Sequence, residues 1–221
     1  MKNKNENVKF DSSHIEKLLK ENSSLVERKL QEYLDQSNFG ILYEPMSYSL
    51  LNGGKRLRPL LCIESSKIFN IGTEKSMYPA LAIECMHSYS LVHDDLPSLD
   101  NDDLRRGKPT IHKKWDEATA ILIGDALQSL SFEILSDKRM NVDSTIRNQL
   151  VFCLAKNAGA SGMVLGQALD IKAESSKKRI SVEEIENLQS YKTGKLISWS
   201  CEVGAILSNE DTSPFKKYAL C

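Results

Sequence analysis

A short acidic run carries the strongest chemical signal in the sequence. Residues 93–103 read His-Asp-Asp-Leu-Pro-Ser-Leu-Asp-Asn-Asp-Asp, which places five aspartates within ten residues. Close carboxylates repel one another unless water or a cation compensates them. An EF-hand loop is a poor match because no Gly or Glu stands at the required spacing. Mg²⁺ instead takes one or two carboxylates with substrate phosphate oxygens, and Asp94 and Asp100 can supply these if Pro97 ends a helix and turns the chain back.

Two basic clusters accompany the acids. Residues 104–110 read Leu-Arg-Arg-Gly-Lys-Pro-Thr, and residues 53–59 read Gly-Gly-Lys-Arg-Leu-Arg-Pro. Guanidinium groups beside acid-bound metal ions form a diphosphate site, and glycines let the backbone approach an anion closely. The helix expected from Pro59 also favours anions at its start. The simpler alternative for both regions is a solvated loop whose charges pair at the surface, which stabilises little.

Three weaker features could extend such a site. His87 lies seven residues before Asp94, two helical turns or about 10 Å along one face. Gln167 and Asp170 share a face at a spacing of three residues, and Lys192-Thr193 precedes a glycine. Each of these features alone is more often a structural, capping or surface group.

The elements that must position these residues are helices. Apolar residues recur at helical spacing, prolines are absent from residues 110–213, and Ser13–Glu16 and Ser181–Glu184 match capping boxes. The expected helices cover about 13–37, 45–52, 59–69, 76–95, 116–135, 143–157, 161–174, 181–192 and 196–208. No strand pattern stands out. We expect one all-α domain over residues 1–221.

The composition excludes several classes of protein. The 221 residues contain 29 basic and 30 acidic side chains, and 41% of them are hydrophobic, as in a globular protein. The net charge of −1 gives no global attraction to nucleic acid or anionic membrane. We see neither a secretory signal nor an apolar run of about 18 residues. The five cysteines are scattered, which favours reduced thiols and a cytoplasmic location.

Together the motifs resemble those of the trans-isoprenyl diphosphate synthase (polyprenyl synthetase) family, most closely its bacterial farnesyl-type members. The resemblance rests on the segments 53–59, 93–107, 166–170 and 192–194, and extends over roughly residues 10–208. It implies an antiparallel helix bundle around a central apolar cavity, usually in a homodimer. The implied reaction is Mg²⁺-dependent condensation of isopentenyl diphosphate with an allylic diphosphate, dimethylallyl or geranyl, to give farnesyl diphosphate.

The resemblance also implies roles for particular residues. Isopentenyl diphosphate would be bound by Lys55, Arg58, His87 and Arg106. Asp94 and Asp100 would bind Mg²⁺ with support from Asp95, and Arg105 would bind the allylic diphosphate. Lys192, Thr193 and Gln167 would face the reacting allyl group.

Product length in such proteins depends on residues just before the acidic motif. Tyr89, five residues before Asp94, would form a floor of the cavity, and Ser90 beside it is small. The two extra residues with Pro97 inside the motif also resemble bacterial C15 synthases. We therefore expect a C15 product in preference to C20 or C10, while an ordinary packed core aromatic is the simpler reading of Tyr89.

The sequence departs from the family at its end. The second aspartate-rich motif is absent, since the acids after Lys192 are Glu202, Glu210 and Asp211. The resemblance therefore predicts a C-terminally truncated chain of uncertain activity. Two other readings stand beside the synthase: a non-catalytic regulatory or partner subunit of a full-length synthase, and a class I terpene cyclase. The basic loop at residues 53–59 argues against the cyclase, which needs no second diphosphate site.

Overall fold

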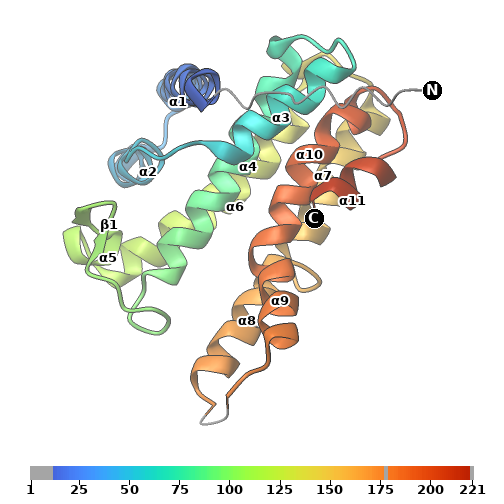
Figure 1. The fold of residues 1–221 in the computed structure, drawn as a ribbon. Coiled ribbons are helices and arrows are strands. Elements are labelled where there is room, and N and C mark those ends of the chain that lie inside the picture. Colours follow the sequence, from blue (N-terminus) through green and yellow to red (C-terminus); the bar gives the residue numbers. More distant parts are fainter. Residues whose placement is uncertain (1–11, 177–178, 220–221) are drawn as a thin grey trace.

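The computed structural model describes residues 12–176 and 179–219, and helices dominate this part of the chain (Figure 1). The α-helices are α1 (Ser12–Asp35), α2 (Tyr43–Leu50), α3 (Leu57–Ile68), α4 (Thr73–Asp94), α5 (Ile111–Lys114), α6 (Glu117–Ser136), α7 (Ser144–Ala158), α8 (Met163–Glu174), α9 (Val182–Gln189), α10 (Lys195–Leu207) and α11 (Ser213–Ala219). Short helical turns are η1 (Gly40–Leu42), η2 (Lys138–Met140) and η3 (Ser190–Gly194). The all-α prediction is confirmed.

Local signals set several helix starts. The Asp116 side chain accepts a hydrogen bond from the Thr119 amide at 2.6 Å and caps α6. The capping box at Ser181 is formed in both directions, with Glu184 as its partner. Helix α1 begins at Ser12, one residue before the cap expected at Ser13. These interactions are local in sequence, which is why the sequence alone reveals them.

The short helices α5 and α11 were not predicted from the sequence, nor were two further local features. Strands β1 (Leu104–Arg105) and β2 (Lys108–Pro109) form a small antiparallel hairpin. Strands of two residues are too short to show an alternating pattern, so the sequence did not reveal them. The segment η3, where an α-helix was expected to continue to residue 192, is a π-helical turn. Such turns occur frequently at functional sites.

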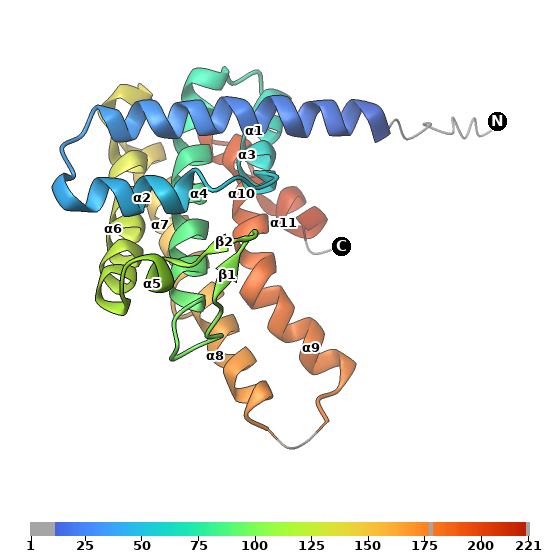
Figure 2. The same ribbon diagram turned by 90° about the vertical axis from the view of Figure 1, so that its left-hand side faces the viewer.

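Helix α4 lies at the centre of the molecule. It packs against α6 on one side and α3 on another, and α10 lies along α3 (Figure 1). Its buried residues are mostly apolar or small and recur around the helix, as expected for a central helix. Helix α1 lies across the other helices, with α2 beside it (Figure 2). The core contains side chains from many helices, including Leu30, Met86, Ile123, Leu150 and Trp199.

One helix in the described ranges, α6, is long and apolar enough to cross a membrane by length and composition. This differs from the expectation that no apolar run would be long enough. In the fold, α6 packs along α4, and its residues Ile123, Leu127 and Ile134 are fully buried. The core helix of a folded domain passes the same test, so the finding is weak evidence for a membrane span.

Candidate functional site

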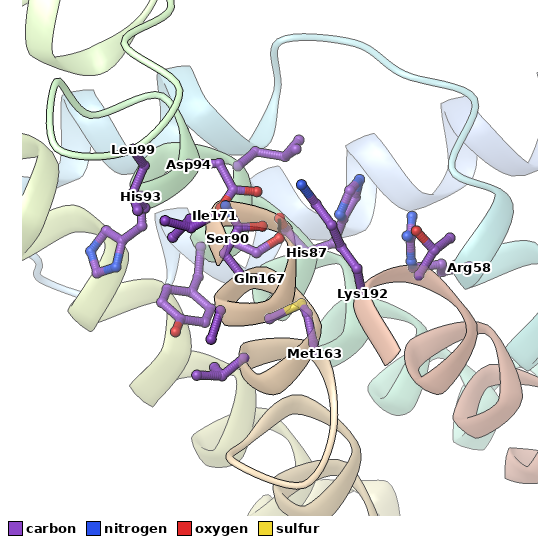
Figure 3. Close-up of a pocket in the computed structure, with 15 residues that line it drawn as sticks. Arg58, His87, Ser90, His93, Asp94, Leu99, Met163, Gln167, Ile171 and Lys192 are labelled. Carbon is purple, nitrogen blue, oxygen red and sulfur yellow. Dashed lines mark hydrogen bonds between the residues drawn. The ribbon is translucent and has the colours of Figure 1, made fainter. Parts of the chain in front are cut away.

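A pocket of about 380 Å³ opens between α3, α4, α8 and η3 (Figure 3). Its volume lies within the range of small-molecule sites. The predicted site residues that line it are Arg58, His87, Tyr89, Ser90, Asp94, Gln167, Lys192 and Thr193. Lys55, Asp95, Asp100, Arg105 and Arg106 are not among the lining residues. The fold thus gathers eight predicted residues from segments that are far apart in the sequence.

The acidic motif ends α4 and then turns back over the end of the helix. Asp94 is the last residue of α4, and the Asp100 amide donates to the Asp94 carbonyl oxygen at 2.9 Å. Pro97 lies in this turn. The turn therefore brings the backbones of Asp94 and Asp100 together. The ring of His93 points away from Asp94 in Figure 3, and its Nε2 lies 3.1 Å from the Ile121 carbonyl oxygen of α6.

The environment of Asp94 leaves its charge poorly compensated. Its pKa is raised to about 6, chiefly by burial, with smaller contributions from Asp100 and Asp95 and against the opposing effects of Lys192 and Arg105. A carboxylate with a raised pKa is stabilised by a nearby cation. Hard carboxylate oxygens that face phosphate-binding groups suit Mg²⁺. Asp94, with Asp100 close enough to raise its pKa, therefore offers the donor chemistry that Mg²⁺ prefers.

The described residues contain no group of three or more His, Cys, Asp or Glu side chains arranged to hold a metal ion. Asp95 is engaged elsewhere, because its Oδ1 accepts hydrogen bonds from Arg105, including one from Nε at 2.9 Å. Asp95 is buried. In this structure its carboxylate is paired with Arg105, which also contacts Asp102 at 3.3 Å.

Basic groups surround the other end of the pocket. Burial lowers the pKa of His87 well below its usual value, and the neighbouring arginines Arg58, Arg106, Arg56 and Arg105 lower it further. These cations lie close enough to act on one imidazole, although they come from segments almost fifty residues apart. Such a concentration of positive charge favours a polyanion such as a diphosphate.

The two basic segments contact each other directly. Arg106 of the hairpin donates to the carbonyl oxygen of Gly53. Gly54 has a φ of +126°, and a Cβ there would lie 2.8 Å from the Arg106 guanidinium. The backbone conformation favours glycine at this position, and a side chain there would also have to displace the Arg106 guanidinium. Lys55 is exposed beside this contact, outside the pocket lining.

The third wall consists of α8 and η3. Lys192 forms an ion pair with Asp170, and Thr193 donates to the Gln189 side chain at 3.2 Å. Burial opposes the charge on Lys192, but the Asp170 hydrogen bond and the charges of Asp170 and Asp94 raise its pKa. The Lys192 ammonium group therefore stays protonated. Its side chain extends toward Asp94 in Figure 3.

Two donors in the pocket lining have no hydrogen-bond partner within the described residues. They are the buried Nε of Arg58 and the buried Nε2 of Gln167. Most buried polar atoms in folded proteins have partners. Their residues line the pocket, but the two atoms themselves are covered, so a ligand oxygen reaches them only after the side chains move.

Tyr89 and Ser90 lie in the pocket wall near Asp94. The Tyr89 ring packs edge-on against the His93 ring, with centroids 5.1 Å apart. The Ser90 hydroxyl donates to the His87 carbonyl oxygen at 2.8 Å, so its donor is satisfied within the helix. The large ring of Tyr89 and the small side chain of Ser90 thus line the pocket together, and both precede the acidic motif in the sequence.

Arg56 was predicted only as one of several loop cations, and the structure shows a different environment for it. Its side chain is fully buried and forms ion pairs with Glu84 of α4 and Glu27 of α1. Its backbone is left-handed, with φ 49° and ψ 42°. Neither feature has a signal in the local sequence, since both depend on partners 28 and 29 residues away.

Comparisons with known proteins agree with this geometry. The family model described as "Polyprenyl synthetase" matches residues 40–220. Farnesyl diphosphate synthase of Geobacillus stearothermophilus is 42% identical over 201 residues, which is 89% of this chain and 66% of that protein. Farnesyl diphosphate synthase of Escherichia coli is 47% identical over 168 residues, 76% of this chain and 56% of that protein.

A solved structure supports the same relationship. The FPP/GFPP synthase of Zymomonas mobilis superposes with a TM-score of 0.88 at 41% identity, covering 94% of this chain and 77% of that one. The chain spans 66% and 56% of the lengths of the two curated relatives. Since the match covers most of the chain in sequence and in fold, this chain belongs to the polyprenyl synthetase family.

Proposed function

We propose that this chain carries the substrate sites of a Mg²⁺-dependent prenyltransferase that condenses isopentenyl diphosphate with dimethylallyl or geranyl diphosphate to give farnesyl diphosphate. One observation supports this most strongly. A single pocket holds an acidic wall at Asp94, a basic wall at Arg58 and His87, and a third wall at Gln167 and Lys192. Two diphosphates that must react with each other require this combination of charges around one space.

The first proposed step is ionisation of the allylic diphosphate. Asp94 and Asp100 would hold Mg²⁺, which when bound neutralises the departing diphosphate. Arg105, oriented by Asp95, and Lys192 would add positive charge around the same oxygens. Electrostatic stabilisation of separating charge in a site that excludes water would supply most of the rate enhancement.

The second step is attack by isopentenyl diphosphate. Arg58, His87 and Arg106, with the exposed Lys55, would bind its diphosphate and hold its double bond toward the allyl cation. The Thr193 hydroxyl and the Gln167 amide would direct their oxygens toward that cation. Carbon–carbon bond formation and loss of a proton then complete the reaction, and no enzyme nucleophile is needed.

Product length would depend on Tyr89 and Ser90. The growing tail would extend along α4 away from Asp94 and meet the Tyr89 ring. Tyr89 lines the pocket, which supports its role as a floor. We therefore propose a C15 product.

Within residues 12–176 and 179–219, the pocket lining contains no second cluster of aspartates. Of the acids after Lys192, Glu202 is buried and bonded to Ser198 and Lys216, and Glu210 and Asp211 lie outside the pocket lining. A diphosphate leaving group would then lack part of its compensating charge. We propose that the polypeptide of residues 1–221 by itself binds both diphosphates but turns them over slowly or not at all.

The test is incubation of the purified polypeptide with geranyl diphosphate, isopentenyl diphosphate and Mg²⁺, with separate measurement of binding and of product length. Binding of both ligands with no product is the expected result. A C15 product would contradict the proposed inactivity and support the Tyr89 floor. A folded polypeptide that binds neither ligand would contradict the proposed function.

The alternative is a non-catalytic regulatory or partner subunit of a full-length prenyl diphosphate synthase. The same missing acidic cluster favours it, because the diphosphate loops remain while turnover would be lost. Mixing this chain with an intact synthase of the family would distinguish the two. Co-sedimentation with a change in the synthase's product length supports the partner role, whereas independent sedimentation contradicts it.

We also propose that residues 1–221 form one domain that assembles as a homodimer in the cytoplasm. Helix α6 exposes Ile121 and Leu122, which are 46% and 55% accessible. Exposed large aliphatic side chains on adjacent positions of a long helix suit a protein interface. The scattered cysteines, which favour reduced thiols, support the cytoplasmic location.

A further inference from the structure

We infer that helix α1 positions the basic loop of residues 53–58, and that Asn22 and Ser23 are positioning residues for the diphosphate bound there. This inference rests on the proposed function. No residue of α1 lines the pocket, so α1 acts on the site indirectly. Its contacts with the loop include two hydrogen bonds to the loop backbone and an ion pair with Arg56.

Helix α1 holds the loop at two carbonyl groups. Asn22 Nδ2 donates to the Arg56 carbonyl oxygen at 3.1 Å, in a buried position. Ser23 Oγ donates to the Gly54 carbonyl oxygen at 3.1 Å. These are consecutive residues of one helix that bind alternate residues of the loop, so together they define both the position and the direction of its backbone.

Arg56 fixes the loop from its other side. Its guanidinium is buried between Glu84 of α4 and Glu27 of α1, and its Nη2 donates to the Leu50 carbonyl oxygen at 2.6 Å. A buried guanidinium with these partners has little freedom to move, since an unpaired charge there would be costly. Arg56 is therefore an anchor, and it is not available to a ligand.

The anchor requires an unfavourable backbone conformation. Arg56 has φ 49°, in the left-handed region that is unfavourable for a non-glycine residue. Contacts around the residue must offset this cost. The Asn22 bond reaches the carbonyl of this residue, which also accepts from the Leu60 amide at 3.0 Å at the start of α3.

The strained turn decides where the neighbouring cations point. With Arg56 directed into the core, Lys55 is exposed and Arg58 lines the pocket beside His87. If the turn relaxed, the spacing of these two charges would change, and a diphosphate held by both would bind more weakly. Helix α1 thus contributes to affinity although it lies outside the site.

The experiment compares Asn22→Ala, Ser23→Ala and the double variant with Ser24→Ala, using the whole 221-residue chain. Ser24 is the next residue of the same helix and is exposed, which makes it a matched control. One readout is hydrogen exchange of the Leu60 amide, which is bonded to the Arg56 carbonyl. The other is the affinity for isopentenyl diphosphate and, with Mg²⁺, for geranyl diphosphate.

We expect each single variant to speed Leu60 exchange and to weaken isopentenyl diphosphate binding about two- to tenfold, the effect of one lost hydrogen bond. The affinity for geranyl diphosphate should change by less than about twofold. Ser23→Thr, which keeps the hydroxyl, should retain the wild-type Leu60 exchange rate and the wild-type affinity for isopentenyl diphosphate. A merely structural role would weaken both ligands equally, and that result would overturn the inference.

Exchange at Leu60 as slow as in Ser24→Ala would also overturn it. If the wild-type chain bound neither diphosphate, the proposed function would fail, and the exchange rates alone would still decide whether α1 holds the loop.

Discussion

The pocket displaces the pKa values of two of its groups in opposite directions. Burial and the surrounding arginines lower the pKa of His87, so this imidazole stays neutral near pH 7. Burial and neighbouring acids raise the pKa of Asp94 to about 6. Each shift disfavours the charged form, and each marks a place where a bound ligand of opposite charge would gain energy.

His87 makes the folded chain less stable in acid. An unfolded histidine has a pKa near 6.5, and the folded one lies lower. The unfolded state therefore binds more protons below pH 6.5, and stability is lost as the pH falls. We expect the free energy of unfolding, relative to His87→Gln, to drop by about 1 kcal/mol between pH 7.5 and 5.5.

Chemical denaturation of both proteins at each pH measures this difference. The comparison also removes the opposite contribution of Asp94, which is the same in both proteins. Parallel stability curves would contradict the argument.

Asp94→Asn should stabilise the fold while it weakens the site. The raised pKa means that the ionised carboxylate destabilises the folded state above pH 6. Allowing for partial exposure, its removal should add about 1–2 kcal/mol to the free energy of unfolding at pH 8. Calorimetry should show Mg²⁺-dependent geranyl diphosphate binding weakened by about tenfold or more.

An exposed acid gives the matched control for that variant. Glu186→Gln on α9 should change neither quantity. A loss of stability in Asp94→Asn would show that the carboxylate has a partner that outweighs its burial.

Tyr89→Ala should extend the cavity. Removal of the ring opens space along α4, so the affinity for farnesyl diphosphate should rise relative to geranyl diphosphate by about tenfold, the effect of burying one or two further methylenes. Ser90→Ala is the control, because it removes a hydroxyl satisfied within the helix and adds little volume. Unchanged selectivity in Tyr89→Ala would place the floor at another residue.

At the scale of elements, two glycines set how closely helices approach. A Cβ at Gly166 of α8 would overlap the backbone of Lys192 in η3, and a Cβ at Gly204 of α10 would overlap the backbone of Ser65 in α3. The first contact places Lys192 in the pocket wall, whereas the second lies in the core. Substitution of alanine for glycine at the two positions therefore distinguishes an effect on core packing alone from an effect on the geometry of the site.

Gly204→Ala should destabilise the fold by about 1–3 kcal/mol and leave diphosphate affinity within about twofold at a temperature where the protein is folded. Gly166→Ala should cost stability and also weaken geranyl diphosphate binding several-fold, because Lys192 must move. Thermal unfolding and calorimetry measure the two effects. Equal ligand affinities in the two variants would show that the position of Lys192 does not matter.

Element boundaries were largely predictable. The expected helices agree with the observed ones to within about three residues over most of the chain, and Asp116 and Ser181 cap helices as expected. The helix bounds and the two caps depend on interactions between residues a few positions apart in the sequence. The π-helical turn at η3 was missed because it arises where α8 packs against the chain, and the local sequence gives no signal for such packing.

At the scale of the whole molecule, the exposed aliphatic face of α6 should govern assembly. We expect the wild-type chain to sediment as a dimer at micromolar concentration and Leu122→Glu to sediment as a monomer, because a charge buried at an interface is costly. Ile68→Glu is the control, since Ile68 is 67% exposed and lies on a different helix, α3. A dimer that survives Leu122→Glu would place the interface elsewhere.

The sequence by itself determined the all-α class, the helices, the family and the acidic and basic motifs. Those properties depend on periodicity, capping and residue type, which are local. The resemblance already assigned Arg58, and not Arg56, to the diphosphate, but only the tertiary structure shows the physical reason. Arg56 turns into the core because Glu84 and Glu27 lie there, and Arg58 is left for the site. Burial depends on partners far along the chain, so no local pattern distinguishes the two arginines.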